Sequence, residues 1–140
     1  MFERKIFQGM LRWKEQYAPY YALFLKGARR VGKTTLAEKL GREAYDSYIL
    51  IRFDQADQFV KDLFVNGLRD LDSFFAQLQF EYKTQLYRRK SLIILDEIQL
   101  FPQARQALKT LLEDGRYDYL ETESLAGITK RSKDLSLIHI

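Results

Sequence analysis

The sequence has 140 residues, of which 46% are apolar and 30% charged, a balance that fits one globular domain and excludes disordered, collagen-like and coiled-coil chains. It contains no cysteine, so disulfides and thiolate chemistry are excluded, and a zinc site would depend on His139 alone. The 23 basic and 19 acidic residues give a net charge of +4. No apolar run approaches the roughly 20 residues of a membrane span, and residues 1–6 lack a secretory pattern, so we expect a cytoplasmic protein without a membrane partner.

The distribution of charge bears on the kind of partner. Basic residues occur in short groups along the chain, each with acidic residues nearby. This spacing favours an ordinary solvated surface over a nucleic-acid patch, which would gather its charge on one face. A nucleic-acid or protein partner stays open.

The first half of the chain predicts helix, strand, helix and strand. Apolar residues recur at helical spacing over residues 3–14 and indicate a leading amphipathic helix. Residues 20–25 are apolar without a break, which is typical of a short strand covered on both faces. A glycine-rich turn then leads into a second helix that reaches Ala44, and residues 47–53 are again strand-like.

The second half predicts a longer helix over residues 71–89 and a third apolar strand over 92–95, whereas 54–68 show a mixed pattern without a definite element. A further helix is expected to open at Pro102, because proline favours the first helical position. Residues 117–122 predict a fourth strand.

This alternation of strands and helices predicts the fold class. Strands joined by helical crossovers form a parallel sheet with helices on both faces, so we expect a three-layer α/β sandwich over residues 1–135. In such sheets the functional site lies at the carboxyl ends of the strands.

A glycine-rich loop follows the first predicted strand and opens the second helix. Residues 27–34 match the pattern of glycine, four residues, glycine, lysine, then serine or threonine that is typical of phosphate-binding loops. Converging backbone N–H groups and a helix N-terminus favour a bound phosphate there. The residues expected to bind the nucleotide are Gly27, Ala28, Arg29, Arg30, Val31, Gly32, Lys33, Thr34 and Thr35.

Five side chains receive roles in nucleotide hydrolysis. Lys33 would contact the β- and γ-phosphates, the Thr34 hydroxyl would bind Mg²⁺, and Thr35 would support the α-phosphate. Asp96, at the end of the third apolar strand, would hold Mg²⁺ together with Thr34. Its neighbour Glu97 would activate the attacking water. Gln99 is either a residue that orients the same water or an ordinary surface glutamine.

Two other classes of phosphate-loop protein fit less well. GTPases require an Asn-Lys-x-Asp segment that reads the base, and the sequence contains none. Small-molecule kinases usually lack a glutamate base next to the strand-end aspartate and carry an arginine-rich lid. Adjacent Asp96 and Glu97 therefore favour a nucleotide hydrolase that uses Mg²⁺ as a cofactor.

Several polar residues are weaker candidates for the same site. Thr122 and Ser124 lie at the end of the fourth predicted strand and are candidates to sense the γ-phosphate. Arg29, Arg30 and Arg105 are candidates to stabilise charge in the transition state.

Residues 27–34, Leu95 to Gln99 and Arg116 to Thr122 resemble a prokaryotic family of AAA-type ATPases, AAA_14, whose members usually continue into a DUF4143 domain. The resemblance covers about residues 1–135 and implies a domain that binds ATP with Mg²⁺ and has a core strand order of 5-1-4-3-2. It also implies that this chain is an N-terminal ATPase fragment whose fifth strand and lid are missing, so that the first strand becomes a sheet edge. In this family a glycine stands where this sequence has Glu123, and we expect a carboxylate there to repel the γ-phosphate.

The segment 135–140 resembles a translated sequencing adapter, and we treat residues 136–140 as a candidate assembly artefact. The leading hypothesis is an ATPase module that is coupled to an absent C-terminal domain. The alternatives are a nucleotide-binding fragment without turnover and a phosphotransferase that acts on a small acceptor.

Overall fold

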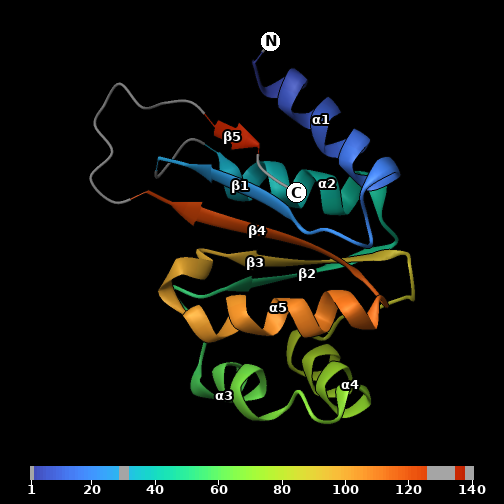
Figure 1. Ribbon diagram of the computed structural model, residues 1–140, viewed down its shortest axis with the longest axis vertical. Coiled ribbons are helices and arrows are strands. Elements are labelled where there is room, and N and C mark those ends of the chain that lie inside the picture. The colour runs from blue at the N-terminus through green and yellow to red at the C-terminus, as the bar shows by residue number, and fades with distance from the viewer. Residues whose placement is uncertain (1, 29–31, 126–134, 138–140) are drawn as a thin grey trace.

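The structure, a computed structural model, describes residues 2–28, 32–125 and 135–137 (Figure 1). Its strands are β1 (Leu23–Gly27), β2 (Ser47–Arg52), β3 (Ser91–Asp96), β4 (Asp118–Ser124) and β5 (Leu135–Leu137). Its helices are α1 (Phe2–Gln16), α2 (Lys33–Ala44), α3 (Gln58–Asn66), α4 (Leu71–Tyr82), the short 3₁₀ helix η1 (Ile98–Leu100) and α5 (Pro102–Asp114). Within those residues no helix combines the length and apolar character that a membrane crossing requires.

One sheet holds all five strands, in the order β2-β3-β4-β1-β5. The first four strands are mutually parallel, whereas β5 runs antiparallel to β1. Helices α1 and α2 lie on one face of the sheet, and α3, α4 and α5 lie on the other (Figure 1). The prediction of a three-layer α/β sandwich of the P-loop NTPase type is therefore confirmed.

The central strand β3 shows why the sequence folds into layers. All six of its residues are buried, because side chains alternate between two helix-covered faces. Leu92 and Ile94 join the core beneath α1 and α2. Ile93 and Leu95 join the second core, beneath α3, α4 and α5. A continuous apolar run is thus what this position in the sheet requires.

The position beside β1 differs from our expectation of a missing fifth strand. Residues 135–137 pair with β1, with Lys26 opposite Ser136. This pairing satisfies backbone groups at an edge that the four parallel strands would leave open. The prediction that the first strand forms an unpaired edge is wrong. The neighbouring strand is short and antiparallel, and includes residues that we had treated as a candidate artefact.

Two other element boundaries differ from those predicted from the sequence. The first strand begins at Leu23, because the backbone N–H groups of Tyr20 and Tyr21 bond back to Tyr17 in a turn that follows α1. The helix predicted over 71–89 ends at Tyr82, because Lys83 adopts a left-handed conformation (φ 51°) that terminates α4.

The segment without a definite prediction, 54–68, contains helix α3. The Asp57 side chain accepts a hydrogen bond of 3.1 Å from the Val60 backbone N–H and so caps the first turn. This aspartate, followed by apolar residues at helical spacing, was the signal that could have identified the helix.

A buried polar cluster lies at the opposite end of the sheet from the glycine-rich loop. The Asp118 carboxylate, 3% exposed at the start of β4, accepts a hydrogen bond of 2.5 Å from the Tyr45 hydroxyl. Arg89 forms an ion pair with the same carboxylate. Burial and the nearby Asp118 charge raise the pKa of Tyr45, which therefore remains a hydrogen-bond donor. The cluster ties the end of α2 to the segment that precedes β3.

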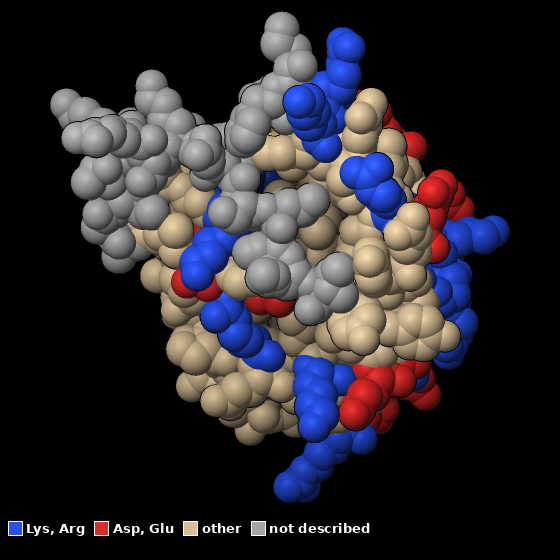
Figure 2. All heavy atoms as spheres, turned by 45° about the horizontal axis from the view of Figure 1, so that its top comes forward, with Lys and Arg blue, Asp and Glu red and all other residues tan. Residues whose placement is uncertain are grey.

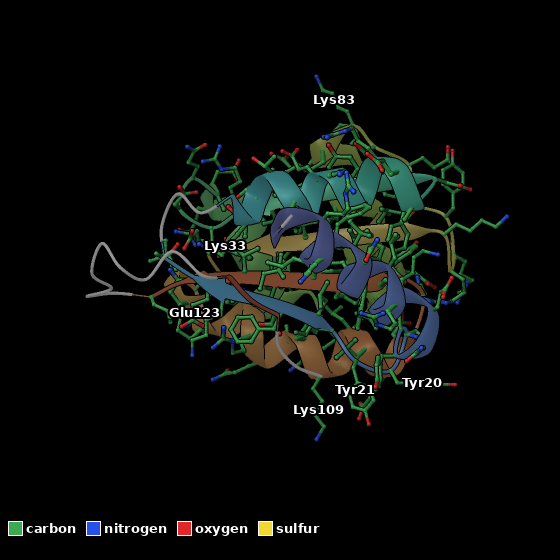
Figure 3. The ribbon with its side chains drawn as sticks, turned by 90° about the horizontal axis from the view of Figure 1, so that it is seen from above. Tyr20, Tyr21, Lys33, Lys83, Lys109 and Glu123 are labelled. Atoms are coloured by element: carbon green, nitrogen blue, oxygen red, sulfur yellow. The ribbon has the colours of Figure 1, made fainter. Side chains whose placement is uncertain are left out.

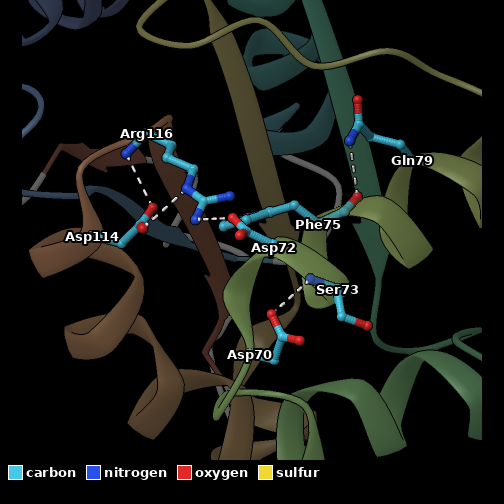
Figure 4. Close-up of polar contacts among 7 residues, drawn as sticks. All are labelled: Asp70, Asp72, Ser73, Phe75, Gln79, Asp114 and Arg116. Carbon is cyan, nitrogen blue, oxygen red and sulfur yellow. Dashed lines mark hydrogen bonds and ion pairs between the residues drawn. The ribbon is translucent and has the colours of Figure 1, made fainter.

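A second polar contact joins α4 to α5. Arg116 binds Asp72 in the first turn of α4 at 2.6 Å and Asp114 at the end of α5 at 3.1 Å (Figure 4). Asp70 accepts a hydrogen bond from the Ser73 backbone N–H and caps α4 (Figure 4). These contacts fix α4 beside α5.

Candidate functional site

The candidate site lies where β1, β3 and β4 end at the same edge of the sheet. The strands are neighbours in the order β3-β4-β1, and in register Gly27 stands opposite Ser124. The glycine-rich loop follows β1, Asp96 is the last residue of β3, and Glu97 comes directly after it. The topology therefore brings together residues that lie about a hundred positions apart in the sequence.

Lys33, the first residue of α2, is 4% exposed and folds back over the loop. Its Nζ donates hydrogen bonds to the carbonyl oxygens of Gly27 (3.3 Å) and Ala28 (2.8 Å), and to Ser124 Oγ (3.1 Å). The preceding Gly32 has φ +89°, which a residue with a side chain rarely adopts. This glycine lets the chain turn sharply enough to place a lysine at the start of the helix.

Asp96 is joined to two threonines. Its Oδ1 accepts hydrogen bonds from Thr34 Oγ1 (2.8 Å) and Thr122 Oγ1 (2.7 Å). The residue is only 2% exposed, and this desolvation raises the pKa of its carboxyl, although the two threonine hydrogen bonds oppose the shift. Asp96 thus stands between the start of α2 and the end of β4.

Glu97 leaves the strand in a left-handed conformation (φ 56°) that directs its side chain toward β4. Its carboxylate accepts hydrogen bonds from Ser124 Oγ (2.6 Å), from the Ser124 backbone N–H (3.2 Å) and from Gln99 Nε2 (2.7 Å). Burial alone would raise its pKa, but these bonds and the Lys33 charge outweigh that effect and lower it. Glu97 is therefore an ionised acceptor at neutral pH.

The two candidate sensor residues both reach this group. Thr122 Oγ1 donates a hydrogen bond to Asp96 and accepts one of 2.9 Å from the Glu97 backbone N–H. Ser124 Oγ is hydrogen-bonded to Lys33 and to Glu97. They are buried on the α2 face of β4. One hydrogen-bonded network therefore connects the loop lysine with both carboxylates.

Glu123 lies on the other face of the strand, contrary to our expectation that it would repel a γ-phosphate. Side chains alternate along a strand, and Glu123 forms an ion pair of 2.7 Å with Arg105 of α5. Figure 3 shows Lys33 and Glu123 on opposite sides of this end of the sheet. Arg105, which also pairs with Glu121 at 3.4 Å, thereby lies away from the site. The prediction that it could stabilise transition-state charge does not fit this position.

The remaining predicted residues fall into two groups. Thr35 is exposed at the first turn of α2, on the side of the helix that meets α1. Arg29, Arg30 and Val31 lie outside the described residues.

Gln99, weighed only as a second candidate to orient water, contacts Glu97 directly. Its Oε1 is buried and has no hydrogen-bond partner within the described parts of the chain. The Asp-Glu-x-Gln spacing was the available signal for this contact.

The donor atoms at Thr34 and Asp96 fit Mg²⁺. A hydroxyl and a carboxylate oxygen are hard ligands, and Mg²⁺ commonly takes one or two carboxylates with phosphate oxygens and water. Among the residues that the structure describes, no three acidic or histidine side chains form a group that could hold a metal ion by themselves. The donors therefore suit a metal that arrives with a phosphate ligand.

The charged surface shows no single basic stripe on the face seen in Figure 2. Lysine and arginine side chains form several separate groups there, with aspartate and glutamate between them. This arrangement agrees with the spread of charge along the sequence.

Comparison with known proteins identifies the family. Neither the curated proteins nor the solved structures gave a significant match to this chain. The family model AAA_14, described as an AAA domain, matches residues 19–138, which include β1, the glycine-rich loop and all of the strand ends described above. This family is associated with nucleotide binding and ATPase-type function, and the chain belongs to the AAA_14 family of AAA domains.

Proposed function

We propose that this protein binds ATP with Mg²⁺ on the glycine-rich loop and hydrolyses it to ADP and phosphate. The observation that carries the proposal is the network in which Lys33, Asp96 and Glu97 are linked through Ser124 and Thr122. A cation, two carboxylates and the N-terminus of a helix meet there at one sheet edge. Phosphoryl transfer depends mainly on positioning and charge stabilisation, which such a group supplies.

The loop residues would bind the phosphates. On phosphate binding, the Lys33 ammonium group would exchange its contacts with loop carbonyls for phosphate oxygens, a stronger charge-assisted interaction. Backbone N–H groups at the start of α2 would add donors aligned with the helix dipole. Thr34 and Asp96 would hold Mg²⁺, which when bound neutralises charge on the β- and γ-phosphate oxygens.

Glu97 would act as the base. A water held by its carboxylate attacks the γ-phosphorus, the bond to the bridging β–γ oxygen breaks, and Glu97 takes the water proton. Ser124 and Gln99 orient the carboxylate, because each donates a hydrogen bond to it. Thr122 fixes the backbone at the same position by accepting the Glu97 N–H.

A phosphate-release assay with product analysis tests this function. We expect the wild-type chain to release ADP and phosphate from ATP in the presence of Mg²⁺. Glu97→Gln should bind ATP normally but lose at least about 100-fold in turnover, since the amide cannot accept the proton. Glu43→Gln, an exposed carboxyl change on α2, is the matched control and should retain wild-type turnover.

Other outcomes would replace the proposal. ATP that stays bound and unchanged would indicate a nucleotide-binding fragment, and a phosphorylated acceptor without free phosphate would indicate a phosphotransferase. Turnover in Glu97→Gln equal to the wild type would show that another group is the base.

A further inference from the structure

Strand β2 forms an open edge of the sheet. Among the described strands it pairs with β3 alone, whereas β5 closes the opposite edge beside β1. Its six residues include no proline and no lysine, two residue types that commonly block an edge, and none of them adopts a left-handed conformation. The strand can therefore accept a further strand along its free side.

The backbone groups on this free side follow from the pairing with β3. The Phe53 backbone N–H donates a hydrogen bond of 3.0 Å to the Asp96 carbonyl oxygen. Successive residues of a strand direct their backbone groups to opposite sides, so Ile51 bonds to β3 as well. Tyr48 and Leu50 then direct their N–H and C=O groups away from the sheet, where no described strand lies.

A groove of about 260 Å³ opens beside this free side. It is smaller than the roughly 300–1,000 Å³ of most small-molecule sites, so it suits one long side chain rather than a whole ligand. The end of β2, the start of α3 and the end of α4 form its walls, with lining residues that include Leu50, Arg52, Asp57, Val60, Glu81 and Tyr82. A segment paired with β2 would therefore place a side chain at the groove.

The charge of the groove favours a basic side chain. Burial and the charges of Asp57 and Glu81 raise the pKa of Tyr82 to about 12, so both carboxylates lie near its hydroxyl. No ion pair within the described ranges of the chain engages either carboxylate. Arg52, the cation among the lining residues, lies 3.6 Å from Asp54, which partly neutralises it.

We propose that β2 binds an extended segment of a partner protein as an added strand, and that the groove accepts a lysine or arginine side chain of that segment. Backbone hydrogen bonds to Tyr48 and Leu50 supply affinity, and the carboxylates of Asp57 and Glu81 supply specificity. A second copy of this chain would present the same carboxylates, so charge favours a separate basic partner over self-pairing. The inference does not depend on the proposed hydrolysis of ATP.

Fluorescence polarisation with labelled synthetic peptides tests the charge preference. The probe is a short peptide of alternating valine and threonine with a central arginine, and the comparison peptide carries glutamate at the centre. We expect the arginine peptide to bind at least about tenfold more tightly, because opposite charges meet in the groove.

Two charge variants locate this preference. The double variant Asp57→Asn with Glu81→Gln should reduce it to about twofold or less, since both carboxylates are lost while asparagine still caps α3. Asp62→Asn is the matched control, because Asp62 is an exposed carboxylate of α3 that does not line the groove. This control should keep the wild-type preference.

Two substitutions at one position test the backbone pairing. Leu50→Pro removes the N–H that faces the open edge, whereas Leu50→Ala keeps it. We expect Leu50→Pro to bind the arginine peptide at least about tenfold more weakly than Leu50→Ala, with folding of each variant established by circular dichroism. If Leu50→Pro does not fold, amide hydrogen exchange of the wild type decides. The arginine peptide should slow exchange at Tyr48 and Leu50 more than at Ile51, which already bonds to β3.

Several results would overturn the proposal. Equal affinity for the two peptides would remove the charge preference, and unchanged exchange at Tyr48 and Leu50 with peptide bound would remove the added strand. Absence of binding of the arginine peptide at about 1 mM protein would exclude both. Dimers of the wild type in sedimentation, with Leu50→Pro monomeric, would show that a second copy of the chain occupies this edge instead.

Discussion

Ser124 Oγ lies 2.6 Å from Oε2 of Glu97, and this hydroxyl also accepts a hydrogen bond from Lys33 Nζ at 3.1 Å. One small side chain at the end of β4 therefore connects the loop cation with the proposed base. The same connection contributes to the lowered pKa of Glu97.

Ser124→Ala should slow hydrolysis about tenfold or more, because hydrogen bonds to charged groups contribute about 1.5–3 kcal/mol. Loss of the hydroxyl also raises the pKa of Glu97 toward its ordinary value. The acid limb of the pH–rate profile should therefore move to higher pH, since the carboxylate takes up a proton more readily. Ser73→Ala, in α4, is the control. An acid limb in the same place for Ser124→Ala and wild type would contradict this role.

Asp96→Asn should keep or raise the stability of the nucleotide-free protein. Both threonine hydrogen bonds go to Oδ1, and an asparagine carbonyl oxygen can accept both. Burial raises the pKa of Asp96 above its unfolded value, so its ionisation costs stability as pH rises through that range, and the neutral amide avoids this cost.

Thermal unfolding of wild type and Asp96→Asn between pH 4 and pH 8 measures the effect. The Tm of Asp96→Asn should exceed that of the wild type by an amount that grows with pH. The variant should also bind ATP more weakly in the presence of Mg²⁺. A Tm about 3 °C or more below wild type at pH 8, equivalent to about 1 kcal/mol, would show that the carboxylate itself stabilises the fold.

Glu123→Gln should leave the affinity for Mg²⁺-ATP within about twofold of wild type. The side chain lies on the α5 face and pairs with Arg105, and a pair with this exposure contributes at most about 1 kcal/mol to stability. Titration calorimetry of the variant checks this position. A large gain in affinity would mean that the carboxylate acts on the phosphate site after all.

Tyr45→Phe should lower the free energy of unfolding by about 1–3 kcal/mol, because the buried Asp118 carboxylate loses one of its partners. Urea denaturation measures this loss. Nucleotide affinity should not change, since the cluster lies at the other end of the sheet. Tyr87→Phe, at a tyrosine that is 41% exposed, is the control and should be close to neutral. Equal stability of Tyr45→Phe and wild type would show that Arg89 alone satisfies the carboxylate.

The layered fold could be predicted because its signals are local. The apolar run of β3 and the proline and glycine that bound α5 report directly on buried strands and helix ends. Boundaries set by long-range contacts could not be read in this way. Residues 20–22 are as apolar as a strand, yet they lie in a turn, and the short apolar segment 135–137 gave no sign of which edge it would join.

The residues of the candidate site could be predicted from their types and their spacing in the sequence. Phosphate and metal binding allow few residue types at the positions of the glycine-rich loop and of the adjacent carboxylates Asp96 and Glu97. The sequence alone did not predict which face of the sheet Glu123 lies on. The faces of Glu123 and Ser124 can be assigned only when the pairing of β4 with β1 is known.

The most direct test of the central claim is the affinity for Mg²⁺-ATP of wild type and Lys33→Ala, measured by titration calorimetry. Lys109→Ala is the control, because Lys109 is exposed on α5, on the opposite side of the sheet from Lys33 (Figure 3). We expect wild type and control to bind ATP alike and Lys33→Ala to bind at least about tenfold more weakly, since it loses a charge-assisted contact with the phosphates. Equal ATP affinity in Lys33→Ala and wild type would contradict the claim that the glycine-rich loop is the nucleotide site.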